Sequence, residues 1–179
     1  MIFEIGKYKL DIDVEKTREF YKTKKTYTYF CDCAGCRNFY AAIETFPQEV
    51  KDFFDRLGVD PKKGAEHYVV KAEDDGKTAM YGGWYHLCGR IMNGENCWKP
   101  VGEGQLIFDD DMMYSVADGW LVGFSDQTVY LLPDGFPTPV LQMEIAFLRV
   151  PWVLDIENPY TLENMKKESE AMLKAKEQE

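Results

Sequence analysis

The spacing of apolar residues changes from strand-like to helix-like between Tyr27 and Phe46. From Tyr27 to Cys31 every second residue is aromatic or a cysteine, which is the period of two that is typical of a β-strand. Beyond Gly35 the apolar side chains follow helical spacing, at Phe39, Tyr40, Ile43 and Phe46. We therefore predict a strand that ends at Cys31 and a helix from about Ala34 to Ile43.

A second helix is predicted directly after the first. Thr45-Phe46-Pro47-Gln48 has the pattern of a capping box, in which the Thr45 oxygen and the Gln48 side chain each satisfy a free N–H group. Pro47 suits the first turn, where its missing donor costs nothing. The helix then has one apolar stripe, formed by Val50, Phe53, Phe54 and Leu57. Gly58 is placed to end it in a left-handed turn.

From Gly64 onward the pattern is that of short strands joined by Asp-Gly turns, which accept the positive φ of tight hairpins. The predicted strand pairs are Ala65–Glu73 with Thr78–Leu87, Met112–Ala117 with Trp120–Phe124, and Thr128–Leu132 with Val140–Val150. The last strand is apolar on both faces over half its length and is therefore predicted to be central. In the first hairpin, pairing Asp74 with Lys77 would set His67 opposite Trp84.

Three further segments complete the outline. Asp13 is a candidate cap for a short helix before Tyr27, and residues 92–104, punctuated by glycine and proline, are predicted to form a long surface loop. Residues 160–179 are charged and helical, with one narrow stripe formed by Leu162, Met165, Ser169 and Met172. We expect this last helix to pack by its first half and to fray beyond about Ala171.

These elements predict an α+β fold in a single domain. We expect an antiparallel sheet of about six or seven strands, with a helical pair on one face and a C-terminal helix. The expected divisions are residues 1–63, mainly helical with one strand; residues 64–158, antiparallel strands; and residues 159–179, the C-terminal helix.

Composition and net charge indicate which classes of partner and which compartment to expect. The 179 residues carry 31 acidic and 21 basic side chains, a net charge of -10 that repels nucleic acid and favours a basic protein partner. The first ten residues lack the apolar core of a signal peptide, and no run of about twenty apolar residues could span a membrane. The odd count of five cysteines, without a secretory signal, predicts free or metal-bound thiols in a reducing cytoplasm.

Cys31-x-Cys33-x-x-Cys36 is the first candidate site. The three thiols could hold a tetrahedral zinc ion, with Cys88 or Cys97 as the fourth ligand. The usual structural zinc signature has two separated Cys-x-x-Cys pairs, and this chain has one. Cysteine also packs readily as a small apolar side chain, and simple packing is the interpretation that the sequence favours.

The same cysteines permit redox chemistry. Cys33-Ala34-Gly35-Cys36 lies between a predicted strand and a predicted helix, where a helix N-terminus stabilises a thiolate. A thioredoxin-like pair requires a βαβ context, however, and here a second helix and several hairpins follow.

Two other groups have simpler explanations. His67 and His86 fall in the first hairpin, where a shared face with Cys88 would suit a metal or a general base, but packing beside Trp84 is the favoured interpretation. Asp109-Asp110-Asp111 is interpreted as a turn, since no calcium-loop spacing surrounds it.

The sequence has no phosphate-binding glycine loop, no Gly-x-Ser-x-Gly and no His-Glu-x-x-His. Whether the chain is an enzyme therefore stays open. The leading hypothesis is an interaction module without catalytic activity, because aromatic residues anchor interfaces and make up 15% of the chain. The alternative is a zinc-binding or thiol-redox protein that uses the segment from Cys31 to Cys36.

Overall fold

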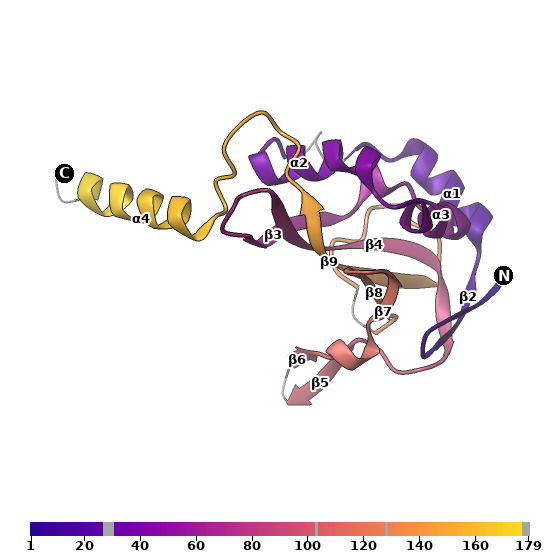
Figure 1. Ribbon diagram of the computed structural model, residues 1–179. Helices are drawn as coiled ribbons and strands as arrows, with labels where there is room; N and C mark the ends of the chain where they lie inside the picture. Colours follow the sequence, from indigo (N-terminus) through magenta and orange to yellow (C-terminus); the bar gives the residue numbers. More distant parts are fainter. Residues whose placement is uncertain (27–30, 103, 128, 177–179) are drawn as a thin grey trace.

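The computed structural model describes residues 1–26, 31–102, 104–127 and 129–176 (Figure 1). Within them the helices are α1 (Val14–Thr23), α2 (Ala34–Ala42), α3 (Gln48–Leu57) and α4 (Leu162–Lys176). The strands are β1 (Ile2–Ile5), β2 (Tyr8–Ile12), β3 (Glu66–Ala72), β4 (Thr78–Asn93), β5 (Trp98–Gly102), β6 (Gln105–Phe108), β7 (Tyr114–Ala117), β8 (Trp120–Ser125) and β9 (Val140–Pro151). The described residues also form the short 3-10 helices η2 (Ile43–Thr45), η3 (Pro61–Lys63) and η4 (Asp110–Met112).

The predicted α+β architecture is confirmed, with a seven-stranded antiparallel sheet and a C-terminal helix. The sheet order is β1-β2-β4-β9-β8-β7, and β3 also pairs with β4. Along one edge, β4 therefore pairs with two strands, with β3 along its first half and with β2 along its last residues. β9 lies between β4 and β8, as its two apolar faces predicted.

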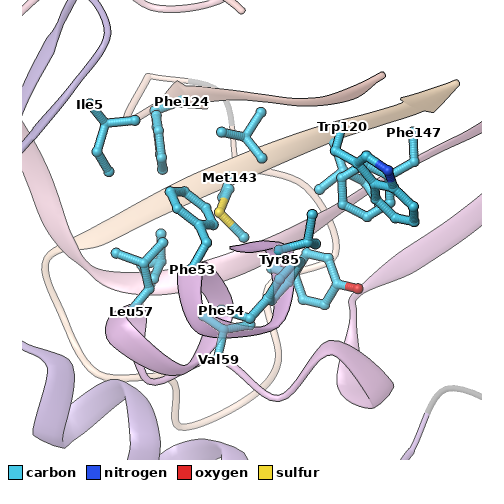
Figure 2. Close-up of a cluster of buried hydrophobic side chains, with 14 of the residues drawn as sticks. Ile5, Phe53, Phe54, Leu57, Val59, Tyr85, Trp120, Phe124, Met143 and Phe147 are labelled. Atoms are coloured by element: carbon cyan, nitrogen blue, oxygen red, sulfur yellow. The ribbon is translucent and has the colours of Figure 1, made fainter. Parts of the chain in front are cut away.

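Helices α1, α2 and α3 lie over one face of this sheet (Figure 1). The stripe predicted on α3 is buried, and Figure 2 shows its side chains among aromatic and aliphatic residues from β4, β8 and β9. Phe54, for example, meets the ring of Tyr85 edge-on at 5.0 Å. Each such side chain contributes roughly 1.5–3 kcal/mol on burial. Gly58 ends the helix in the predicted left-handed conformation, at φ +74°.

The N-terminal third contains both a confirmed helix and a hairpin that was not predicted. Asp13 caps α1 by accepting a hydrogen bond from the backbone N–H of Lys16. Before it, β1 and β2 pair through a turn at Gly6, which has φ +56°. The strand residues are few, so their alternation was too short to separate from a loop.

The capping box at Thr45 was predicted wrongly. The Thr45 hydroxyl donates to the carbonyl of Ala42, 2.7 Å away, and so closes the 3-10 turn η2. The residue at the N-cap of α3 is Pro47, which has no side-chain cap. Because η2 continues directly from α2, Thr45 ends the preceding helical segment and does not begin the next one.

The register of the first hairpin was predicted correctly only beside its turn. Ala72 pairs with Ala79 as expected, but the register shifts between Val69 and Lys71, so Val70 has no partner across the ladder. A β-bulge shifts the pairing of all residues on the far side of it from the turn, here Glu66 to Val69, and so places their side chains on the face opposite to the predicted one. His67 consequently pairs with Gly83 and shares a face with Tyr85, which contradicts the predicted position opposite Trp84.

Three other segments differ from the prediction or lie mostly outside the described residues. β4 continues to Asn93, and β5 and β6 form a small two-stranded sheet in the region expected to be a loop. Residues 129–132 are not in a strand, although the Tyr130 N–H is bonded to the side chain of Gln142; Thr128 lies outside the described residues. The strand predicted from Tyr27 lies outside them too, except for Cys31, which is not in a strand.

Helix α4 extends away from the sheet and the other helices (Figure 1). The expected packing of its first half is not found, since Leu162 and Met165 are 53% and 40% exposed. Four residues before it, Asn158 is buried and donates from its side chain to the carbonyl of Gly76. The chain is therefore fixed to the β3–β4 turn just before the helix begins.

Candidate metal centre

The predicted cysteine trio comes together at the N-terminus of α2. Cys33 is the N-cap residue, and its sulfur accepts the backbone N–H of Cys36 at 3.5 Å. Cys31 precedes it, outside any helix or strand, and Cys36 lies in the first turn. The three sulfur atoms all lie within 4.8 Å of one another. Cys33 is exposed, Cys31 is half-buried and Cys36 is buried.

Neither proposed fourth ligand joins this group in the described part of the chain. Cys88 lies in β4, where its thiol donates to the carbonyl of Thr138 at 3.5 Å. Cys97 is fully buried beside Gly123. The structure thus brings together Cys31, Cys33 and Cys36 and leaves Cys88 and Cys97 elsewhere.

The trio fits a thiophilic ion. Zinc–sulfur bonds of about 2.3 Å in a tetrahedron place sulfur atoms about 3.8 Å apart. Sulfurs already within 4.8 Å of one another need only small side-chain movements to reach that spacing. Three protein ligands leave the fourth position for water or for a group from another molecule, which is the pattern of open rather than closed zinc sites.

The thiols of Cys33 and Cys36 differ in acidity. Burial raises the pKa of Cys33, but hydrogen bonds from the Cys36 N–H, the Cys36 and Cys31 thiols and the Tyr160 hydroxyl outweigh it, so this pKa lies below the ordinary value. Burial, and then hydrogen bonds to the other two sulfurs, raise the pKa of Cys36 well above that of a free thiol. Cys33 is therefore the more easily ionised of the two.

Tyr160 was not predicted to take part. Its hydroxyl accepts the N–H of Gly35 at 3.2 Å, and its own carbonyl accepts the N–H of Ala72 at 3.3 Å. A Cβ at Gly35 would lie 2.9 Å from the side chain of Val69 and 3.0 Å from this hydroxyl, so a larger residue would displace one of them. The contact joins residues 125 positions apart, and nothing local in the sequence indicates it.

Asn38 was also missed. It is fully buried, and its amide donates to the Tyr81 hydroxyl and to the carbonyl of Pro151, at 3.2 and 3.0 Å. Its oxygen accepts the N–H of Val153 at 2.7 Å. Tyr81 in turn donates to the carbonyl of Gly35 at 3.0 Å. These bonds fix the cysteine-bearing turn of α2 to the end of β9.

The histidines do not form a site together. The His67 ring stacks on Phe39 at 4.1 Å and bonds the Tyr85 hydroxyl at 2.8 Å, on the helix-covered face. Burial and then the nearby charge of Lys24 lower its pKa to about 3, so it is neutral. His86 lies on the opposite face, where Nε2 bonds the carbonyl of Tyr130. The prediction that His67 shares a face with His86 was wrong, and His67 packs as a core residue.

The three aspartates form a turn, as interpreted from the sequence. Asp109 accepts the backbone N–H of Asp111 and pairs with Lys99 at 2.6 Å. The hydrogen bond from that lysine is the main cause of the lowered pKa of Asp109. Asp110 begins the 3-10 helix η4.

Within the described residues, no helix combines the length and the apolar content that crossing a membrane requires. No protein-family model, curated protein or solved structure was found to match the chain.

Proposed function

We propose that the chain binds a zinc ion through Cys31, Cys33 and Cys36. The observation that carries the proposal is the approach of three sulfur atoms to within 4.8 Å of one another at one helix N-terminus. Thiolates are soft ligands that select zinc over hard cations. The lowered pKa of Cys33 supports ligation, since a ligating thiol must lose its proton. The bound ion would act as a Lewis acid at its open position.

The surrounding structure supports the same proposal. Gly35 leaves room for Tyr160 beside the sulfurs, and Asn38 fixes the turn that carries Cys36. These contacts hold the ligands in place before the ion arrives, so less ordering accompanies binding. Zinc that binds only the folded chain adds its binding free energy to the free energy of unfolding.

The test is elemental analysis of protein prepared without added metal, together with a thiol count in denaturant. We expect one zinc per chain, and its loss in each of Cys31→Ser, Cys33→Ser and Cys36→Ser. Cys88→Ser is the matched control, because that thiol lies outside the trio; it should keep the metal. A chelator should lower the melting temperature of the wild type. Metal content no higher than in a triple serine variant would refute the proposal.

A second candidate function is dithiol–disulfide exchange. It is favoured by the pairing of an exposed thiol of lowered pKa, Cys33, with a buried thiol of raised pKa, Cys36. The Cys33 thiolate would attack a substrate disulfide and release one substrate thiolate. Cys36, losing its proton, would then attack Cys33, releasing the second thiolate and leaving a Cys33–Cys36 disulfide. The dithiol is oxidised by two electrons and the substrate is reduced by two.

Alkylation separates these functions. The redox function predicts selective labelling of Cys33 near neutral pH, and a mild oxidant would join it to Cys36 without unfolding the chain. Zinc ligation predicts protection of all three thiols until a chelator is added. Simple packing, which the sequence favoured, predicts slow labelling, no copurified metal and a modest cost of Cys→Ala.

The broader expectation of an interaction module with a basic protein partner in the cytoplasm also stays a proposal. The net charge of -10 and the exposed side chains of Leu162, Met165, Met172 and Leu173 on α4 support it. Charge would steer a basic partner towards the chain, and the apolar side chains would supply contact area.

A further inference from the structure

The sheet face opposite the helices carries an unusual row of buried polar side chains. These are His86, Ser125, Gln142 and Glu144, of which Glu144 is 5% exposed and His86 is 1% exposed. Burying a carboxyl group without a cation costs several kcal/mol unless its hydrogen bonds compensate. The burial of the Glu144 carboxyl group therefore has to be explained by the groups that contact it.

Glu144 is held by neutral donors only. The indole N–H of Trp98 reaches Oε1 at 2.8 Å, and the amide of Gln142 donates to the same oxygen. The Tyr130 N–H, 2.7 Å from the Gln142 oxygen, fixes the direction of that amide. In the described part of the chain, no lysine, arginine or histidine pairs with Glu144, and both bonds end on Oε1. Oε2 is therefore available as an acceptor.

The next row of the same face has a second acceptor without a partner. His86 Nε2 lies 2.9 Å from the Tyr130 carbonyl, and Trp84 donates to this carbonyl at 3.1 Å. A nitrogen that bonds a carbonyl carries the proton, so Nδ1 is an acceptor. This Nδ1 atom is buried and has no hydrogen-bond partner among the described residues. His86 and Gln142 are paired across the ladder, one row from Glu144.

Aromatic rings surround this acceptor-rich face. The Trp84 and Tyr130 rings lie 6.3 Å apart, and Tyr68 covers Gly82, where a Cβ would come within 2.6 Å of its ring. A groove of about 410 Å³ runs between the β5–β6 hairpin and the side chains of Gln127, Val129 and Tyr130, and Trp98 also lines it. Trp98 thus belongs to the groove and also bonds Glu144. Aromatic faces attract cations, and their rings pack well against methylene groups.

We infer that this face binds an alkylammonium group, with the ammonium beside Glu144 and its aliphatic chain along Trp98 and Tyr130. An ammonium needs one free carboxylate oxygen, whereas a guanidinium is best held by both, and Oε1 is already occupied. The net charge of -10 draws cations to the chain. Burial raises the pKa of Glu144, as expected of a carboxyl group whose cation is supplied by a ligand.

The inference is independent of the cysteine trio, which lies at the N-terminus of α2 on the helix-covered side. It gives the proposal of a basic partner a specific site. The alkylammonium group has two sources, a lysine side chain of that partner or a free amine.

The test is a titration followed by the indole N–H resonance of Trp98, assigned by its absence in Trp98→Phe. The probes are pentylammonium and its neutral counterpart pentan-1-ol. We expect a saturable shift with pentylammonium and none with pentan-1-ol. Glu144→Gln keeps an oxygen for Trp98 and removes the charge, and it should weaken binding by about tenfold or more. Glu66→Gln, which removes a partly exposed carboxylate from β3, separated from the Glu144 strand by β4, should leave the affinity within about twofold.

Two results would overturn the inference: equal shifts with pentan-1-ol, or an equal loss of affinity in Glu66→Gln and Glu144→Gln. If Glu144→Gln does not fold, calorimetry on Trp98→Ala decides, because this variant loses a groove wall and should lose pentylammonium binding; unchanged binding would refute the site. Nα-acetyl-lysine methylamide distinguishes the sources. Tighter binding than pentylammonium identifies a partner's lysine side chain, and weaker binding identifies a free amine; both results support the site.

Discussion

Replacing Asn38 with alanine should cost the chain about 3 kcal/mol of unfolding free energy. The side chain is fully buried and makes three hydrogen bonds, to Tyr81, Pro151 and Val153. Alanine leaves the Pro151 carbonyl and the Val153 N–H without this partner, and an unpaired buried group costs about 1–3 kcal/mol. Both of these hydrogen bonds are only partly buried, so water can bond in part to the two groups left unpaired. The total cost of the two unpaired groups therefore stays at about 3 kcal/mol.

Urea unfolding followed by tryptophan fluorescence measures this loss. The midpoint should fall while the slope stays that of the wild type, because the surface exposed on unfolding is nearly unchanged. Asn93→Ala is the matched control, since Asn93 is exposed at the end of β4; it should change stability by less than about 0.5 kcal/mol. A loss below about 1 kcal/mol in Asn38→Ala would refute the claim that this amide joins α2 to β9.

Three other predictions concern separate parts of the chain. Gly58→Ala should cost at least about 1 kcal/mol more than Gly76→Ala in urea unfolding: both have φ near +70°, but a Cβ at Gly58 would meet the carbonyl of Val14 at 2.6 Å, and at Gly76 nothing nearer than 3.5 Å. Equal costs would contradict that close approach. Burial lowers the pKa of His86 to about 4, so below pH about 6.5 the native chain binds fewer protons than the unfolded chain. The free energy of unfolding should therefore decrease through His86 as the pH falls from about 6.5 towards 4. Ring ¹⁵N shifts that show a protonated His86 in the native chain at pH 6 would disprove this. Removing residues 162–179 should leave the melting temperature within about 2 °C, because α4 is exposed, and a larger drop in the monomer would show that it packs.

Much of the fold follows from local pattern, and what fails is non-local. The stripe on α3 and the stop at Gly58 were predictable because each depends on residues within one turn. The bulge at Val70 was not, because it lies within the pairing of β3 with β4 and no turn residue marks it. Thr45 failed for a related reason, because its hydroxyl had two possible partners and continuity with α2 decided between them.

In the candidate site too, the parts that depend on local sequence were predictable and the non-local contacts were not. Cys31, Cys33 and Cys36 are close in sequence, so a helix beginning at Ala34 is enough to bring their sulfurs together. Tyr160 contacts the site from 125 residues away, and Asn38 holds the supporting turn by bonding the carbonyl of Pro151, 113 residues away; no spacing rule reaches so far. The cysteines were therefore predictable, and the groups that fix their geometry and acidity were not.

The position of β4 has a consequence for how the chain folds. This strand pairs with β9, whose residues follow it in sequence by roughly fifty to seventy positions, and it also carries β2 and β3. Long loops must close before such pairs form, which slows folding, whereas the β7–β8 hairpin closes locally. Amides in the middle of β4 and β9 open only when the whole sheet opens. They should be the last in the chain to exchange with deuterium, on the timescale of global unfolding.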